Sequence, residues 1–263
     1  MTDQPKSFGF ELGELVLLID PKDRRYLVTL EDSGSFQNHA GSLQHQDLVG
    51  VEDGSEVQTS LGQSLQVFRP TLSDFILSMP RGAQVIYPKD IGPILMLADI
   101  GPNTKVFESG VGSGALSMAM LQTGASIVGY EIREDFAGRA TNNVRTFLGE
   151  EVLNRYQVHI RDCYEGIDER DFDRVVLDIP EPWNVVAHAG LALKSGGIFV
   201  SYSPSITQSV QTTHALKRSG FGEIKTTEVL HRGWNIAGSS VRPDHRMVAH
   251  TGFLTRARLL NRS

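Results

Sequence analysis

The stretch Lys105–Ser117, KVFESGVGSGALS, constrains the fold of this chain more than any other. A short apolar run is followed by glycines at every second position, Gly110, Gly112 and Gly114, and then by residues with helical spacing. This order predicts a strand, a tight turn and a helix. Glycine suits positive φ and close approach of a ligand, and the free N–H groups that begin a helix favour an electron-rich group. We therefore predict a nucleotide cofactor at this turn.

Acidic residues accompany the turn. Its spacing lacks the third glycine of G-x-G-x-x-G, and the chain has no G-x-x-x-x-G-K-[ST] for a triphosphate. Glu108 lies just before the glycines, and a second apolar run, Ser126–Tyr130, leads into Glu131. A carboxylate about 20 residues past the glycines is placed to accept hydrogen bonds from both hydroxyls of a ribose and to repel the phosphate of NADP.

These residues resemble motif I of the class I S-adenosylmethionine (SAM) methyltransferases, with Glu131 in the motif II position. The resemblance implies a Rossmann-like α/β sheet and SAM as cofactor. The alternative for the loop alone is a glycine-rich turn that only packs tightly.

Composition narrows the class of protein. The 263 residues, 40% hydrophobic and 21% charged, fit one large domain or a medium domain plus a small one. Without an 18-residue apolar run or a signal-like start, we expect no membrane span and a cytoplasmic protein. Cys163 is the only cysteine, which excludes an internal disulfide, and histidine spacing predicts no metal site. The net charge of -6 disfavours unaided nucleic-acid binding.

Residues 1–70 predict a small β-rich domain. We expect strands at Leu15–Ile19, at Tyr26–Leu30, and at Val57–Thr59 paired with Leu65–Phe68, and a polar loop over Ser33–Gln46. Connecting helices follow over 71–100, where Thr71 to Asp74 has capping-box chemistry and Pro88 suits a first helical turn.

From Lys105 the pattern alternates between strands and helices. Strands are predicted at 105–109, 126–131, 156–161, 173–178 and 197–202, and helices at about 114–123, 134–148, 183–193 and 206–219. Such alternation favours a parallel sheet covered on both faces. Phe221–Leu230 and Ala249–Arg258 follow without a helix between them, so we expect the sheet of the catalytic domain, 71–263, to end in an antiparallel hairpin.

Four acids mark the carboxyl ends of successive strands: Glu108, Glu131, Asp162 and Asp178. Ligands of open α/β sheets bind at this edge. A single acid there is more often a solvated loop residue, but four in register indicate a site.

The loop after Asp178 suggests the substrate. Asp178-Ile-Pro-Glu-Pro-Trp183 differs from the N-P-P-Y and D-P-P-Y of many amine methyltransferases and resembles the tRNA adenine-N1 methyltransferases that modify position 58 of the T loop, the TrmI family. Three further stretches carry the resemblance, which covers nearly the whole chain: Gln84–Asp90 (QVIYPKD), Ser203–Gln208 (SPSITQ), and Arg242–Met247 (RPDHRM) leading to His250–Leu254 (HTGFL).

Carried over residue by residue, the resemblance assigns the cofactor and base contacts. SAM would lie against Gly110, Gly112, Ser113, Gly114, Ala115 and Leu116, near Glu108, with Glu131 on the ribose and Asp162 near the adenine. Asp178 and Tyr87 would be catalytic, beside the transferred methyl group and the target base. One departure is Phe136, where some relatives have histidine; an aromatic ring there can still stack on the cofactor adenine.

The resemblance also implies tRNA as partner and a homotetramer. Arg232, Arg242, His245 and Arg246, with Arg81 and Lys89, are candidate phosphate contacts, although solvated loop arginines are an equal alternative. Tyr87 and Trp183 are candidates to hold an extracted base, or else ordinary packing aromatics. The alternatives are a class I methyltransferase for another substrate and a non-catalytic RNA-binding partner subunit, although such a subunit would be expected to have lost the glycine turn and the strand-end acids. A nicotinamide-dependent dehydrogenase is disfavoured, because no Tyr-x-x-x-Lys or His-Asp arrangement accompanies the turn.

Overall fold

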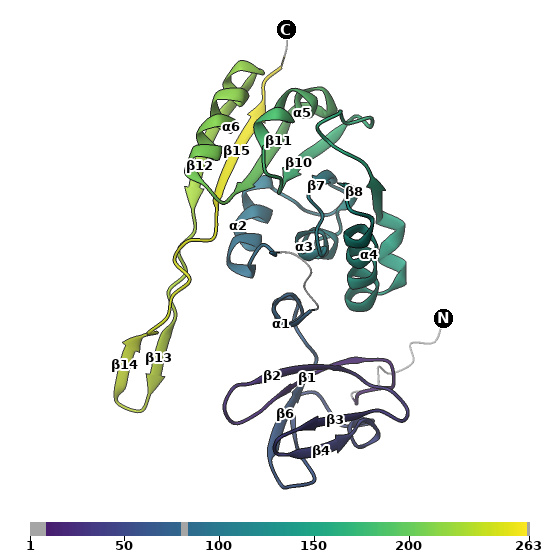
Figure 1. Cartoon of the computed structure of the whole chain (residues 1–263). Helices are drawn as coiled ribbons and strands as arrows, with labels where there is room; N and C mark the ends of the chain where they lie inside the picture. The colour runs from purple at the N-terminus through teal and green to yellow at the C-terminus, as the bar shows by residue number, and fades with distance from the viewer. Residues whose placement is uncertain (1–8, 80–83, 262–263) are drawn as a thin grey trace. The chain divides into compact units, whose positions relative to one another are not determined.

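The computed structural model describes residues 9–79 and 84–261. By its internal contacts the chain divides into two compact units, Met1–Pro80 and Arg81–Ser263 (Figure 1). Arg81, one of the candidate phosphate contacts, lies outside the described residues.

The first unit is a small antiparallel β structure. Its main sheet has the order β2-β1-β6-β5 and a second sheet pairs β3 with β4. The elements are β1 (Leu15–Ile19), β2 (Arg25–Thr29), β3 (Ser35–Asn38), β4 (Gly41–Gln44), the 3-10 turn η1 (His45–Leu48), β5 (Ser55–Gln58), β6 (Ser64–Phe68) and α1 (Leu72–Ser78). Alternate apolar residues, among them Val16, Leu18, Leu65 and Val67, form its core.

The prediction of a polar loop over Ser33–Gln46 is wrong, because this segment contains the β3–β4 hairpin. Phe36 and Leu43 are cross-strand partners and are both buried in the core of the unit. One apolar residue in each four-residue strand is too weak a pattern for sequence reasoning, but it is enough to fix which face of the hairpin is buried.

Helix α1 belongs to the first unit, so the division falls ten residues after the boundary expected at residue 70. The helix starts at the predicted capping box, in which the Thr71 hydroxyl accepts from the Asp74 N–H at 3.2 Å and the Asp74 carboxylate accepts from the Thr71 N–H at 3.0 Å. Asp74 also pairs with Arg25 of β2 at 2.7 Å. This ion pair ties the helix to the β unit.

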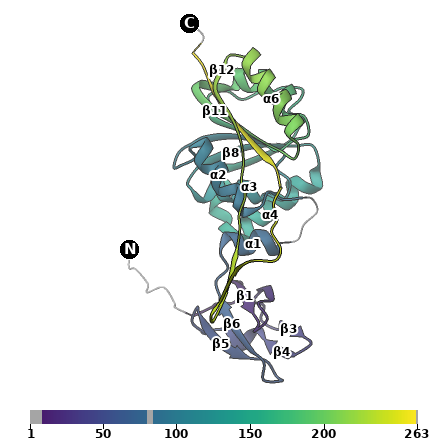
Figure 2. The same cartoon turned by 90° about the vertical axis from the view of Figure 1, so that its left-hand side faces the viewer.

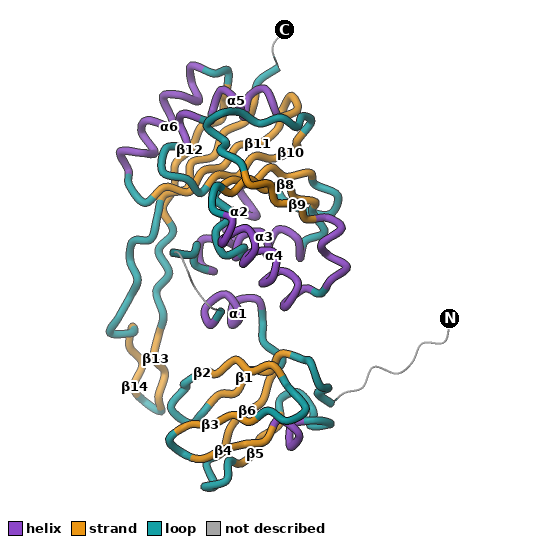
Figure 3. The backbone as a smooth tube through the Cα atoms, turned by 45° about the vertical axis from the view of Figure 1, so that its right-hand side comes forward, coloured by secondary structure: helices purple, strands orange, loops and turns teal. Residues whose placement is uncertain are grey.

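The second unit is a seven-stranded sheet of order β12-β15-β11-β10-β7-β8-β9. Helices α2, α3 and α4 cover one face, and α5 and α6 cover the other (Figure 3). The helices are α2 (Pro88–Ala98), α3 (Ala115–Gln122), α4 (Glu134–Leu148), α5 (Val186–Ala192) and α6 (Ile206–Arg218), with 3-10 turns η2 (Glu150–Arg155) and η3 (Pro182–Asn184). The strands are β7 (Lys105–Ser109), β8 (Ser126–Glu131), β9 (Tyr156–Ile160), β10 (Phe172–Leu177), β11 (Leu193–Ser203), β12 (Phe221–Glu228) and β15 (Phe253–Leu259).

The predicted parallel sheet and its antiparallel end are confirmed. Strands β7 to β11 pair in parallel, whereas β15 runs antiparallel to both β11 and β12. The second strand of the expected hairpin therefore inserts into the sheet beside β11 and does not extend its edge.

Between β12 and β15 the chain leaves the sheet as an arm, which sequence reasoning treated as a loop. The arm, seen edge-on in Figure 2, ends in a hairpin of β13 (Trp234–Ala237) and β14 (Ser240–Pro243), both labelled in Figure 1. Trp234, Ile236 and Val241 are all more than half exposed on it.

In the described part of the chain, no helix combines the length and apolar character that crossing a bilayer requires. Nor do these residues bring together a group of His, Cys, Asp or Glu side chains able to hold a metal ion.

Candidate active site

A pocket of about 470 Å³ opens at the carboxyl ends of β7, β8, β10 and β11, wholly within the second unit. Six of the residues predicted from the sequence line it: Gly110, Gly112, Glu131, Phe136, Asp162 and Asp178. Parallel strands bring their carboxyl ends to one edge, which is why residues up to 68 positions apart meet there.

The glycines of the turn allow two close approaches. Gly110 has φ 82°, and a Cβ built on it would lie 1.9 Å from the backbone oxygen of Asp178. Gly114 has φ 80°, and a Cβ there would lie 3.2 Å from Ala140 of α4. A side chain at position 110 would therefore push the Asp178 backbone out of place.

Glu131 is held by the turn on one side and by its own loop on the other. Its Oε2 accepts from the Gly112 N–H at 3.0 Å and its Oε1 accepts from the Arg133 N–H at 3.1 Å. Both oxygens are thus fixed in direction while the side chain lines the pocket. This geometry fits a carboxylate that presents its remaining lone pairs to a diol.

Asp178 is partly buried in the pocket wall, where its N–H donates to the Ser109 carbonyl at 2.9 Å. Burial, and then the negative charge of Glu131, raise the pKa of Asp178 to about 7. Among the described residues no ion pair forms to Asp178, Glu131, Glu108 or Asp162. Arg133 also lines the pocket, but it pairs with Asp135 at 2.8 Å. The three acids that line the pocket, Glu131, Asp162 and Asp178, therefore favour a cationic ligand.

Glu108 lies behind the pocket and does not line it. Only 2% of the residue is exposed, and its Oε2 accepts from the Ser117 hydroxyl at 2.6 Å. Burial, with the charges of Asp178 and Glu131, raises its pKa to about 8, although the Ser117 hydrogen bond opposes this. Side chains alternate along a strand, so Ser109 lines the pocket and its neighbour Glu108 points to the other face, toward α3.

Ser113, Ala115 and Leu116 are buried and do not line the pocket either. The Asn143 side-chain amide of α4 donates to the Ser113 carbonyl at 2.9 Å and supports the turn from behind. Any contact of this segment with a ligand would have to come from its backbone.

Asp162 and Phe136 line the pocket, and each side chain already has a partner within the protein. The Asp162 carboxylate accepts from the Tyr164 N–H at 2.9 Å. The Arg133 guanidinium lies 3.7 Å from the centre of the Phe136 ring. The expected stack of adenine on Phe136 therefore meets a cation–π pair, and Arg133 covers one face of the ring.

Tyr87 and Trp183 do not line this pocket. Trp183 packs against the core around Phe107 and Phe172, as in the packing alternative. Tyr87 is the N-cap of α2, and its carbonyl accepts from the Asp90 N–H at 2.8 Å. The Asp90 carboxylate accepts from the Thr251 hydroxyl at 2.6 Å, and the Thr251 carbonyl accepts from the Tyr202 hydroxyl at 2.6 Å. Hydrogen bonds thus connect Tyr87 with Tyr202 by way of Asp90 and Thr251.

Among the candidate phosphate contacts, Lys89 is engaged elsewhere. Its Nζ pairs with Asp90 at 2.9 Å and donates to the Val229 carbonyl at 2.7 Å, and its side chain is only 9% exposed. Arg232, Arg242 and Arg246 are exposed on the arm.

Sequence reasoning missed several residues of the pocket wall. Tyr164 and Gln208 both line it, and both hold the loop after Asp178. Tyr164 follows Asp162 closely, and Gln208 ends the stretch Ser203–Gln208, so proximity to a strand end is the signal that would have identified them.

The sequence matches two family models. The family described as "tRNA methyltransferase complex GCD14 subunit" matches residues 64–244, and the family "TrmI-like N-terminal" matches residues 9–57. The first match alone spans more than half of the chain.

Curated relatives and solved structures agree with these matches. The chain is 36% identical to the tRNA (adenine(58)-N(1))-methyltransferase TrmI of Thermus thermophilus over 92% of this chain and 96% of the relative. It is also 36% identical to the tRNA (adenine(57)-N(1)/adenine(58)-N(1))-methyltransferase TrmI of Methanocaldococcus jannaschii, with 92% and 94% covered.

Two crystal structures resemble the fold over the same extent. One, titled a SAM-dependent O-methyltransferase from Thermotoga maritima, is 32% identical with a TM-score of 0.92, covering 97% of this chain and 96% of the other. The other, titled tRNA (m1A58) methyltransferase TrmI from Aquifex aeolicus, is 26% identical with a TM-score of 0.85, covering 97% and 100%. Together with the glycine turn, Glu131 and Asp178 at one sheet edge, these matches show that the chain belongs to the TrmI family of class I SAM-dependent tRNA methyltransferases.

Proposed function

We propose that this protein transfers the methyl group of S-adenosyl-L-methionine to N1 of adenine at position 58 in the T loop of tRNA. The observation that carries the proposal is the pocket in which Glu131, Asp162 and Asp178 converge beside the glycine turn, none of them in an ion pair with a described residue. The donor supplies an electrophilic methyl group on a positively charged sulfur, and this charge matches the pocket.

The geometry of the pocket supports the following cofactor contacts. Glu131 accepts hydrogen bonds from the ribose hydroxyls, with its direction set by Gly112 and Arg133. Asp162 faces the adenine amine, and the Arg133–Phe136 pair forms the wall beside it. Gly110 and Gly112 present backbone to the cofactor, whereas Gly114 lets the turn pack against Ala140 of α4. Behind the turn lie four buried residues: Glu108, Ser113, Ala115 and Leu116.

Asp178 acts on the target base. Adenine N1 has an in-plane lone pair, so attack on the methyl group needs in-line placement and exclusion of water more than a strong base. The product ring carries positive charge. A carboxylate that accepts from the exocyclic amine gains strength as this charge develops, which stabilises the transition state more than the ground state. Tyr87, which the family resemblance places at the target base, supports the everted base.

The charge distribution makes tRNA a reasonable partner despite the overall acidity. Residues 1–80 contain 12 Asp and Glu against 5 Lys and Arg, whereas residues 81–263 contain 19 against 20. The acidic excess is therefore confined to the first unit. Phosphate contacts are proposed for Arg232, Arg242, His245 and Arg246 of the arm.

We also propose a homo-oligomer, a tetramer by resemblance to the family, that works in the cytoplasm where tRNA is modified. The arm supports association, because a two-stranded hairpin is marginally stable alone and this one exposes Trp234, Ile236 and Val241. Several copies could then gather basic arms onto one tRNA.

The test is methyl transfer from labelled SAM to an unmodified tRNA transcript, followed by nucleoside analysis. We expect N1-methyladenosine with adenine at position 58 and none when position 58 is guanine. A preparation that binds SAM but forms no N1-methyladenosine would contradict the proposal. Transcripts with adenine at both 57 and 58 would show whether the neighbouring base is also methylated, as the name of the Methanocaldococcus relative implies for that protein.

A further inference from the structure

The loop that carries Asp178 has few ways to be held in place. Its first residue is fixed by the bond from the Asp178 N–H to Ser109, and the η3 turn begins at Pro182. Between them, Pro180 has no N–H to donate. The middle of the loop therefore depends on side chains from other elements.

Two side chains supply these contacts. The Tyr164 hydroxyl accepts from the Glu181 N–H at 3.0 Å, and the Gln208 amide Nε2 donates to the Pro180 carbonyl at 2.8 Å. Gln208 belongs to α6, which follows β11, whereas the loop follows β10. Because Pro180 and Gln208 both line the pocket, this contact lies in the wall of the site.

Gln208 has a second role that fixes which way its amide faces. Its Oε1 accepts from the Ser205 N–H at 3.0 Å and completes the capping box of α6, in which the Ser205 hydroxyl accepts from the Thr207 N–H at 3.2 Å. The amide oxygen thus meets a donor and the amide nitrogen meets an acceptor. Rotating the amide by half a turn would break both bonds.

We infer that Gln208 is a positioning residue for methyl transfer, whose amide transmits the fixed start of α6 to the Pro180 carbonyl and so sets the direction of the Asp178 carboxylate. The inference rests on the proposed function. Small displacements of a catalytic group are costly, since an error of about 1 Å can reduce a rate about 100-fold.

The chain offers variants that separate the two roles. Gln208→Glu keeps an oxygen for the Ser205 N–H, and glutamate is an accepted capping-box residue, but it cannot donate to Pro180. Gln208→Met has similar length, no charge and neither bond. Ser205→Ala removes the other half of the capping box and leaves the bond from Gln208 to Pro180 intact.

We expect Gln208→Glu and Gln208→Met to lower kcat for tRNA methylation at least tenfold while the Kd for SAM changes less than threefold. The two variants should agree, because the lost bond and not the added charge is the cause. Ser205→Ala should lower the melting temperature by a few degrees and leave kcat within twofold. Thermal melts of all four proteins separate loss of turnover from loss of fold.

Three outcomes would overturn the inference. Turnover of both Gln208 variants within twofold of wild type would exclude a positioning role. An equal loss in Ser205→Ala would show that only helix capping matters. A loss in Gln208→Glu alone would trace the effect to the new charge. The wild-type reaction is read separately, since absence of N1-methyladenosine there contradicts the proposed function itself.

Discussion

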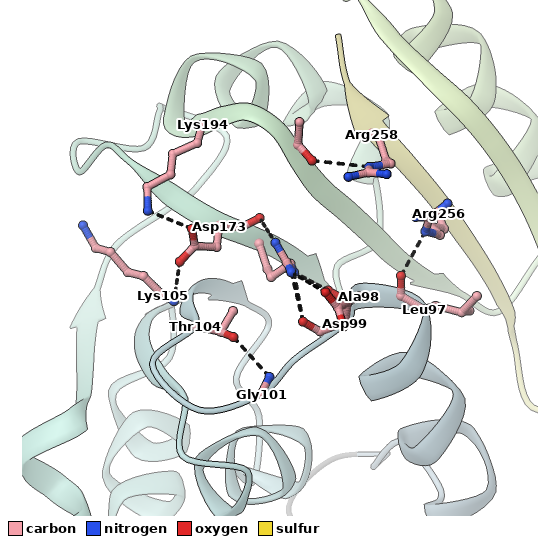
Figure 4. A network of polar contacts seen from close by, with 12 residues as sticks. Leu97, Ala98, Asp99, Gly101, Thr104, Lys105, Asp173, Lys194, Arg256 and Arg258 are labelled. Carbon is pink, nitrogen blue, oxygen red and sulfur yellow. Dashed lines mark hydrogen bonds and ion pairs between the residues drawn. The ribbon is translucent and has the colours of Figure 1, made fainter. Parts of the chain in front are cut away.

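At the amino ends of the parallel strands charged groups are paired, whereas at the carboxyl ends Glu131, Asp162 and Asp178 line one pocket and form no ion pair with a described residue. At the amino edge, Asp173 of β10 accepts from Lys194 Nζ at 2.7 Å and from the Lys105 N–H at 2.9 Å (Figure 4). At the same edge, Arg174 pairs with Asp99 at 3.0 Å.

The pKa values follow this difference. Burial alone would raise the pKa of Asp173, but hydrogen bonds from Lys194 and Lys105 outweigh it and the pKa is lowered. At the other edge burial and neighbouring acids raise the pKa of Asp178 to about 7 and of Glu108 to about 8. At the amino edge of the sheet, charged side chains form ion pairs that stabilise the fold. At the carboxyl edge, the acidic side chains repel one another, and this edge is available to bind a ligand.

The largest expected effect comes from Asp178→Asn, which removes the charge and keeps the shape. We expect single-turnover methyl transfer to fall about 100- to 1,000-fold, the usual cost of losing one electrostatic contact in the transition state. The melting temperature should stay the same or rise, because repulsion from Glu131 is relieved. Turnover within threefold of wild type would remove Asp178 from the mechanism.

The pH dependence provides a companion measurement. A carboxyl with a pKa near 7 is charged above that pH and neutral below it, so kcat/KM for SAM should decline as the pH falls through about 7. The fall of kcat should occur at a lower pH than the fall of kcat/KM, because the positively charged sulfonium of bound SAM favours the ionised carboxylate and so lowers its pKa. In Asp178→Asn the decline of kcat/KM at acidic pH should be absent. If the variant and wild type had the same pH profile, the decline would have to come from another titrating group.

Glu108→Gln tests whether burial of Glu108, with the nearby charges of Asp178 and Glu131, lowers the free energy of unfolding of the protein. With a native pKa near 8 and an ordinary unfolded value, Glu108 retains a proton in the fold that the unfolded chain has lost, so wild-type stability should decrease as pH rises from about 5 to 8. Glutamine has no proton to lose. Relative to wild type, the variant should gain up to about 4 kcal/mol between pH 5 and pH 9, measured by urea unfolding without SAM. Parallel pH dependences would show that Glu108 is not the group responsible.

Much of the sheet was predictable because its signals are local. The bounds of β8, Ser126–Glu131, and of α4, Glu134–Leu148, were predicted to within one residue, since an apolar run and an amphipathic run are separated by a turn. Parallel topology then brings Glu131, Asp162 and Asp178 to one pocket. That step needs only the rule about strand ends.

What sequence reasoning missed depends on contacts that have no local pattern. Successive side chains of a strand point to opposite faces of the sheet, so Glu108 points away from the face that its neighbour Ser109 occupies. Arg133 over Phe136 depends on rotamers, and the contact of Gln208 with Pro180 joins residues 28 positions apart. Such pairs are determined by packing between elements.

The smallest expected effect is at the amino edge, with Asp173→Asn. The isostere weakens the contacts to Lys194 and to the Lys105 N–H, and we expect a loss of about 1–2 kcal/mol in the free energy of unfolding. Methyl transfer should remain within twofold of wild type, since this edge is remote from the pocket residues. Lys194→Met is the matched control: because Lys194 is half exposed, it alone should cost less than Asp173→Asn, and the double variant should show that their effects are coupled. A loss of turnover at constant stability would instead link the amino edge to catalysis and end the contrast between the two edges.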